Sequence, residues 1–278
     1  MNYKILFRGI LPVCVVLSGM SSAGRAEIPS GSPRLDAIRQ NGKLVVGSCF
    51  KFRTLLTADP GTGEPRGFDA DLARALSRRI FGDERKIEWR WAQGKENHGN
   101  IRFLVRGDVD IIVDPIGESA DKEEVGVAFT DEIMPAGNAL LVRKGSPIRS
   151  VADLHEGVRV IMTDFFADVS ILKEVCRGHP PKFLVFGDEW DAREALRTGK
   201  GEVYVDHITH LYDEAAMSPD FTIVGQWTYA AYGMAVKSGD PVFLKYLNDF
   251  IAELRASGEW DRLYQQWFGP YGGNLLRR

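Results

Sequence analysis

The feature that most constrains the fold is the alternation of short apolar strands with amphipathic helices along this chain of 278 residues. Residues 43–48 and 109–113 are compact apolar runs, as expected for strands of a parallel sheet that is covered on both faces. Between them, residues 72–80 place apolar side chains at helical spacing. The pattern restarts after residue 144, with strands expected at 158–163, 183–186 and 203–206. The alternation predicts an α/β fold made of two βαβ-rich parts.

The segment 108–144 lies between these two parts. Its first apolar run ends at Asp114, a polar loop follows, and a second apolar run occupies residues 139–142. Polar residues at the carboxyl end of a sheet strand are where open α/β sheets bind ligands. We therefore interpret the segment as both a wall of a ligand cleft and a crossing between two lobes.

The N-terminus has the pattern of a secretory signal peptide over residues 1–26. Lys4 and Arg8 precede the largely apolar run 9–20, which is too short for a membrane span, and small residues follow. The signal peptide predicts a periplasmic protein, whereas an uncleaved anchor is the alternative. A net charge of −3 gives no reason to expect nucleic acid as a partner.

Cysteines and histidines leave alternatives open. Cys49 and Cys176 remain after cleavage, and they are either bridged or two buried thiols. His207 and His210 follow Asp206 closely enough to suggest a metal site, but exposed helix histidines are the simpler interpretation. We assign no metal, no cofactor and no catalytic residue, and we expect a protein that is not an enzyme.

Four segments resemble one family when taken in order. They are GFDADL at 67–72, GDVD at 107–110, ALLVRKG at 139–145 and GEWDRLY with WFG at 258–269. This pattern resembles the extracytoplasmic solute-binding proteins of family 3, which serve polar amino-acid ABC transporters. The resemblance implies a two-lobed, type II periplasmic-binding-protein-like fold with two strand crossings and a ligand cleft between the lobes. It places residues 34–140 plus 237–278 in lobe I and 141–236 in lobe II.

The resemblance also implies ligand-binding positions. The aromatic residue that stacks on the ligand corresponds to Phe50 or Phe52, unless these rings only pack on lobe I. Asp206 corresponds to the aspartate that binds the ligand's ammonium group, and the alternative is that it caps the helix that follows.

The loop that clamps the ligand carboxylate departs from the family pattern. The arginine position falls on Glu123, with Lys122 beside it, and a polar position upstream becomes Glu118. In lobe II, Asp164 and Phe165 stand where the family has an anion-binding turn. An acidic cleft would repel a carboxylate, so we expect a solute that is cationic or lacks a carboxylate. The alternative is that the loop has shifted and these acids are solvated.

The function predicted from these features is the capture of a small polar, amino-acid-like or cationic solute for an ABC transporter. The expected partners are the solute and the permease in the inner membrane, and the expected state is a monomer. A periplasmic accessory or sensor protein with a diverged site is one alternative. A second is an enzyme resembling cyclohexadienyl dehydratase, in which a cleft carboxylate acts as a general acid.

Overall fold

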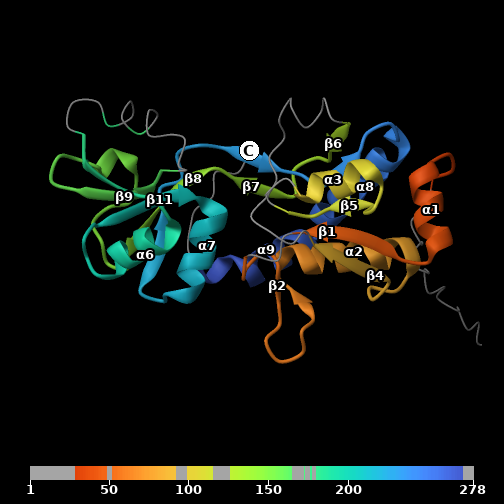
Figure 1. Cartoon of the computed structure of the whole chain (residues 1–278), viewed down its shortest axis with the longest axis horizontal. Coiled ribbons are helices and arrows are strands. Elements are labelled where there is room, and N and C mark those ends of the chain that lie inside the picture. Colours follow the sequence, from red (N-terminus) through yellow and green to blue (C-terminus); the bar gives the residue numbers. More distant parts are fainter. Residues whose placement is uncertain are drawn as a thin grey trace, which may run out of the picture.

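The structure is a computed structural model of the whole chain, and it describes residues 29–48, 52–91, 99–114, 126–164, 172, 176 and 180–271. The strands of this part of the chain form two five-stranded sheets and a two-stranded ribbon between them, besides a small hairpin. Figure 1 shows the two sheets side by side along the long axis, each with its own helices. The prediction of a two-lobed α/β fold with two strand crossings is confirmed.

The sheet of lobe I contains strands from both ends of the chain. Its order is β4 (Ile87–Trp91), β1 (Leu44–Ser48), β5 (Ile111–Ile112), β14 (Ala235–Lys237) and β6 (Val127–Phe129). β1 is parallel to β4 and β5, whereas β14 is antiparallel to β5 and β6. The hairpin comprises β2 (Thr57–Ala58) and β3 (Pro65–Arg66). The helices described in this lobe are α1 (Pro33–Asn41), α2 (Phe68–Phe81), α3 (Gly99–Arg106), α8 (Pro241–Ala256) and α9 (Glu259–Trp267), followed by η2 (Gly269–Tyr271).

The sheet of lobe II is built from the middle of the chain. Its order is β10 (Lys182–Phe186), β9 (Arg159–Thr163), β11 (Val203–His207), β8 (Asn138–Arg143) and β12 (Phe221–Val224). β9 is parallel to both β10 and β11, whereas β8 is antiparallel to β11 and β12. The helical elements described in this lobe are η1 (Val151–Asp153), α6 (Glu189–Arg197) and α7 (Ile208–Met217).

Local sequence signals explain where the first helix begins and ends. The Ser32 side chain accepts a hydrogen bond from the backbone N–H of Leu35, and Pro33 occupies the first helical position. Gly42 ends the helix in the left-handed conformation, with φ of 70°. None of the described helices combines the length and the apolar character that a membrane span requires.

Two short antiparallel strands carry the chain between the lobes. They are β7 (Met134–Ala136) and β13 (Ala230–Tyr232), which run between the two sheets (Figure 1). β8 begins at Asn138 and already belongs to the second sheet, whereas β14 begins at Ala235 and already belongs to the first. By sheet pairing, the crossings therefore lie slightly before the boundaries that we expected at residues 140 and 236. The apolar run 139–142 is buried because it occupies an interior position of the second sheet, not because it crosses.

The lobes also touch away from the crossings. Tyr212 of α7 lies against Phe268, which follows α9, with ring centroids 4.6 Å apart, and Phe268 in turn lies 5.3 Å from the ring of Phe68. The Tyr212 hydroxyl is 2.7 Å from the hydroxyl of Tyr264 on α9. These buried rings join the packing of lobe II to that of lobe I in one continuous core.

A polar contact reinforces this apolar one. Asp213 of α7 accepts hydrogen bonds from the backbone N–H groups of Arg53 and Thr54 at 2.9 and 3.0 Å. It also accepts one from the Thr54 hydroxyl at 3.0 Å. Asp213 and Thr54 are both buried, so the carboxylate is satisfied by lobe I rather than by solvent.

Candidate functional site

Asp206 lies at the carboxyl end of β11, where the strand turns directly into α7. Its Oδ2 accepts a hydrogen bond of 2.5 Å from the Tyr204 hydroxyl, and its Oδ1 accepts one of 2.7 Å from the backbone N–H of His207. Tyr204 and Asp206 lie two residues apart on a strand and therefore share one face of the sheet. The alternative that Asp206 caps α7 is wrong, because the cap residue is His207 and its side chain makes no capping bond. Asp206 is instead a buried carboxylate held inside lobe II.

The surroundings of Asp206 keep it ionised. Burial acts to raise the pKa of this carboxyl, but the contact with His210 and the hydrogen bonds from Tyr204 and His207 hold the pKa below its ordinary value. A buried carboxylate that stays charged is suited to bind a cationic group.

His210 joins Asp206 to an aromatic ring of lobe I. Its Nδ1 lies 3.3 Å from Oδ1 of Asp206, one helical turn further along the chain. The imidazole stacks on Phe52, with ring centroids 5.3 Å apart and an interplanar angle of 19°. Phe52 and Asp206, two of the ligand-binding positions that the family resemblance implies, are thus brought to one place through a histidine between them.

Tyr232 is the last residue of the second crossing strand, β13, and its side chain contacts His207, the residue after Asp206. Its hydroxyl lies 2.9 Å from Nδ1 of His207, and the two rings stack. Burial raises the pKa of Tyr232 well above its ordinary value, and the negative charges of Asp114 and Asp206 act in the same direction. Asp114 follows β5 of lobe I, so carboxylates from both lobes act on one hydroxyl at the crossing.

A third acid of this region, Asp69, is buried within electrostatic reach of Asp114. Asp69 is 3% exposed, and its Oδ2 has no hydrogen-bond partner in the structure. Burial raises its pKa well above the ordinary value, and the charge of Asp114 adds to this. Asp69 does not cap α2, whose cap is Gly67 without a side-chain bond. Both effects favour the protonated form of Asp69 more than the protonated form of an exposed aspartate.

The other predicted site residues are placed as follows. Asp164 is exposed, at the carboxyl end of β9, the strand that pairs in parallel with β11. It therefore lies on the same edge of the sheet as Asp206. The remaining predicted residues lie outside the described residues: Phe50, Glu118, Lys122, Glu123 and Phe165.

The sequence prediction missed the partners of Asp206. His210 was interpreted as an exposed helix histidine or as half of a metal site, but its side chain is only 31% exposed and it is paired with Asp206. The spacing of four residues between Asp206 and His210, across a strand-to-helix junction, is the sequence signal that could have indicated this pairing. In the described part of the chain, no group of three or more His, Cys, Asp or Glu side chains is arranged to hold a metal ion.

Cys176 bears on the open question of a disulfide. It is a free and buried thiol, and burial raises its pKa. Its possible partner Cys49 lies outside the described residues. A buried thiol with a raised pKa is a poor nucleophile, so Cys176 has no place in the candidate site.

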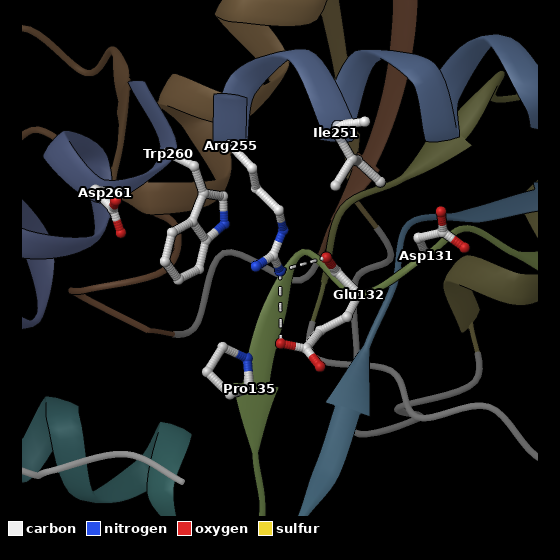
Figure 2. Close-up of a pocket in the computed structure, with 8 residues that line it drawn as sticks. Asp131, Glu132, Pro135, Ile251, Arg255, Trp260 and Asp261 are labelled. Atoms are coloured by element: carbon white, nitrogen blue, oxygen red, sulfur yellow. Dashed lines mark hydrogen bonds and ion pairs between the residues drawn. The ribbon is translucent and has the colours of Figure 1, made fainter. Parts of the chain in front are cut away.

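A separate hollow of about 550 Å³ lies against β7 and the helices α8 and α9. Figure 2 shows Arg255 in this hollow, between the ring of Trp260 and Glu132. Arg255 lies 4.7 Å from the Trp260 ring centroid and donates a hydrogen bond to the backbone carbonyl of Glu132. The Glu132 carboxylate also accepts a hydrogen bond from Tyr229. The charges of Arg255 and Glu132 in this hollow are therefore paired with each other, and none of the predicted ligand-binding residues that the structure describes lines it.

The chain matches the model of the bacterial extracellular solute-binding proteins, family 3, over residues 45–270. It belongs to this family, which confirms the resemblance seen in the sequence. It is 30% identical over 247 residues to the ABC transporter glutamine-binding protein GlnH of Bacillus subtilis, and the match covers 88% of each chain.

Solved structures agree on the two-lobed fold. One is an ancestral cationic amino acid solute-binding protein, with a TM-score of 0.69, 27% identity and coverage of 84% of this chain and 99% of that one. A second structure of the same ancestral protein, AncCDT-1, describes it as a precursor of cyclohexadienyl dehydratase and matches with a TM-score of 0.61, 26% identity and coverage of 86% and 100%.

Proposed function

We propose that this solute-binding protein captures a small solute with a positively charged group, of the cationic amino acid or amine class, and delivers it to an ABC permease. The observation that carries the proposal is Asp206, a buried and ionised carboxylate at the cleft edge of lobe II. Asp114 adds a second acidic group from lobe I, and Phe52 adds an aromatic ring. An ammonium or guanidinium group is attracted to both kinds of partner.

Binding between two lobes also explains how capture would work. A solute that contacts Asp206 in lobe II and Asp114 or Phe52 in lobe I gains its full binding energy only when the lobes are close. It therefore shifts the protein toward the closed state by the difference in contacts. The short crossing strands β7 and β13 are the elements that can bend during this motion.

Titration calorimetry with a small panel of solutes tests the proposal. Arginine, lysine and putrescine are the cationic members, glutamine is neutral, and glutamate and aspartate are anionic. We expect at least one cationic compound to bind with a dissociation constant in the micromolar range or below. Tight binding of glutamate or aspartate would contradict the acidic cleft.

Three further properties belong to the proposal. We take the mature protein to be periplasmic and monomeric, and we take it to bind its solute without chemical change. Incubation with prephenate, followed by a search for phenylpyruvate, tests the dehydratase alternative, and product formation would overturn our assignment. Sedimentation of the mature protein tests the oligomeric state, and the N-terminal sequence of the exported protein tests cleavage after residue 23 or 26.

A further inference from the structure

The carboxylate that we propose as the ligand anchor already has a partner that can carry a positive charge. His210 lies on the first turn of α7 and points its Nδ1 at Oδ1 of Asp206, at 3.3 Å. That nitrogen makes no regular hydrogen bond, so the pair is held by charge and proximity rather than by a well-aligned bond. An ion pair of this kind can be exchanged for another cation without breaking the rest of the network.

Each element around His210 contributes a group that faces it. Glu189 of α6 places its Oε1 at 3.7 Å from Nδ1, and Arg193 of α6 provides the opposing positive charge. Arg193 is itself paired with Glu189 and with the buried Glu214 of α7. The ring of His207 lies 6.5 Å from the His210 ring, and Phe52 of lobe I covers its face.

These charges favour the protonated imidazole. Burial and Arg193 act to lower the pKa of His210, but Asp206 and Glu189 outweigh them and raise the pKa above its ordinary value of 6.5. A histidine whose pKa is raised keeps its positive charge to a higher pH than a free imidazole does.

We propose that protonated His210 is the built-in cation that occupies Asp206 in the ligand-free protein, and that the positively charged group of the solute replaces it. The inference rests on the proposed function, since it describes how that same site is regulated. Replacement moves the imidazole away from Asp206 and Phe52, which frees the carboxylate and the aromatic face together. Solute capture then releases a proton, and affinity increases as the pH rises.

The size of the effect follows from linkage. Affinity increases by up to about tenfold for each pH unit between the pKa of His210 with solute bound and its raised pKa in the ligand-free protein, and it levels off on either side of this window. By reciprocity, the bound solute lowers the pKa of His210 by the same coupling. A glutamine at position 210 cannot carry the charge, so affinity in His210→Gln becomes independent of pH.

Calorimetry with arginine as the probe, between pH 5.5 and 7.5, tests this inference. The guanidinium of arginine stays charged over this range, so the protein supplies the pH dependence. Repeating the titration in buffers of different ionisation enthalpy counts the protons released. We expect the release to be largest just above pH 6.5, where the displaced imidazole loses its proton, and to fall toward zero at pH 5.5. His210→Gln should lose this release, whereas His155→Gln, an exposed histidine of lobe II, should retain it.

The outcomes separate the inference from the function on which it rests. Arginine binding with no proton release in the unaltered protein would overturn the inference alone, and so would equal release in His210→Gln. Failure of arginine and every other cationic compound to bind at any pH would overturn the proposed function.

The NMR titration of the His210 ring is a second test, and it needs no variant of this histidine. We expect its pKa to fall on addition of arginine, and an unchanged value with arginine bound would contradict the exchange.

Discussion

Asp206 is the residue on which solute affinity should depend most, because its carboxylate is buried and held by three partners from its own lobe. Asp206→Asn keeps the size of the side chain and removes the charge. Truncating one member of a buried charge pair costs about 2–4 kcal/mol of binding energy, which corresponds to roughly 30- to 1000-fold in affinity.

The measurement for this variant is the dissociation constant of arginine at pH 7.5. Asp249→Asn is the matched control, since Asp249 lies on α8 and pairs only with Lys245 at the surface. We expect the control to bind as tightly as the unaltered protein. A dissociation constant for Asp206→Asn within threefold of the control would show that the ammonium group is bound elsewhere.

The Asp206–His210 pair should also make folding stability depend on pH. The pKa of His210 is raised in the folded protein, so its contribution is complete below its ordinary value of 6.5 and is lost as the pH rises through the folded value. The pKa of Asp206 is lowered, so its contribution is complete above 3.8 and is lost as the pH falls through the folded value. The pair therefore stabilises most between about pH 4 and 6.5.

Urea unfolding at several pH values measures this contribution. The difference in the free energy of unfolding between the unaltered protein and His210→Gln should be largest near pH 5–6 and should shrink toward pH 8.5. A difference that grows with pH would mean that the folded protein holds His210 neutral.

At the scale of elements, the crossing from β7 to β8 depends on one glycine. Gly137 has φ of 130°, and a Cβ at this position would lie 2.1 Å from the backbone oxygen of Thr228, in the segment that leads to β13. Two chain segments therefore approach each other too closely for any side chain. The close approach fixes the distance between the two crossings.

Gly137→Ala should lower the free energy of unfolding by about 3 kcal/mol or more, because it adds both strain at positive φ and a backbone clash. Gly145→Ala is the matched control. Gly145 also has positive φ, at 85°, but nothing lies within 4 Å of its added Cβ, so this variant should cost only about 1 kcal/mol. Equal losses in the two variants, by urea unfolding, would show that conformational strain alone matters at Gly137.

The sequence predicted most helices and the longer strands because their periodicity is strong. The spans expected at 43–48, 158–163 and 203–206 match β1, β9 and β11 to within one residue. The short strands β6, β7 and β12 were missed, since three or four residues carry too little pattern. The apolar run 109–113 was expected as one strand, but only Ile111–Ile112 pairs in the sheet as β5.

The candidate site was predicted only in part, for a physical reason. Asp206 and Phe52 were predicted because the family resemblance implies an ammonium-binding aspartate and a stacking aromatic residue at these positions. The pairing of His210 with Asp206 could be suspected from its spacing, but the ring of Phe52 above it comes from 158 residues earlier in the chain. Contacts between residues this distant depend on the lobe arrangement, which local patterns do not contain.

At the scale of the whole molecule, the continuous core predicts that the lobes unfold together. Phe268 is 1% exposed and lies between Tyr212 of lobe II and Phe68 of lobe I. We expect a single transition by differential scanning calorimetry in the unaltered protein.

Phe268→Ala should lower stability by about 3–5 kcal/mol and split this transition in two, because it removes the ring that joins the lobes. Phe243→Ala is the control. Phe243 is equally buried, on α8 of lobe I, so its loss should lower the transition temperature without splitting it. Two well-separated transitions in the unaltered protein would contradict the idea of one cooperative core.

The position of β14 has a consequence for how the protein is made. This strand lies between β5 and β6, yet it is residues 235–237 of the chain, after every strand of the second sheet. A chain that has entered the compartment where it folds as far as residue 230 has supplied the described strands of lobe II but not the one that joins β5 to β6. Lobe I, which holds the beginning of the chain, is therefore the last lobe to be completed. The protein cannot bind its solute between two finished lobes until residues 235–237 have also arrived.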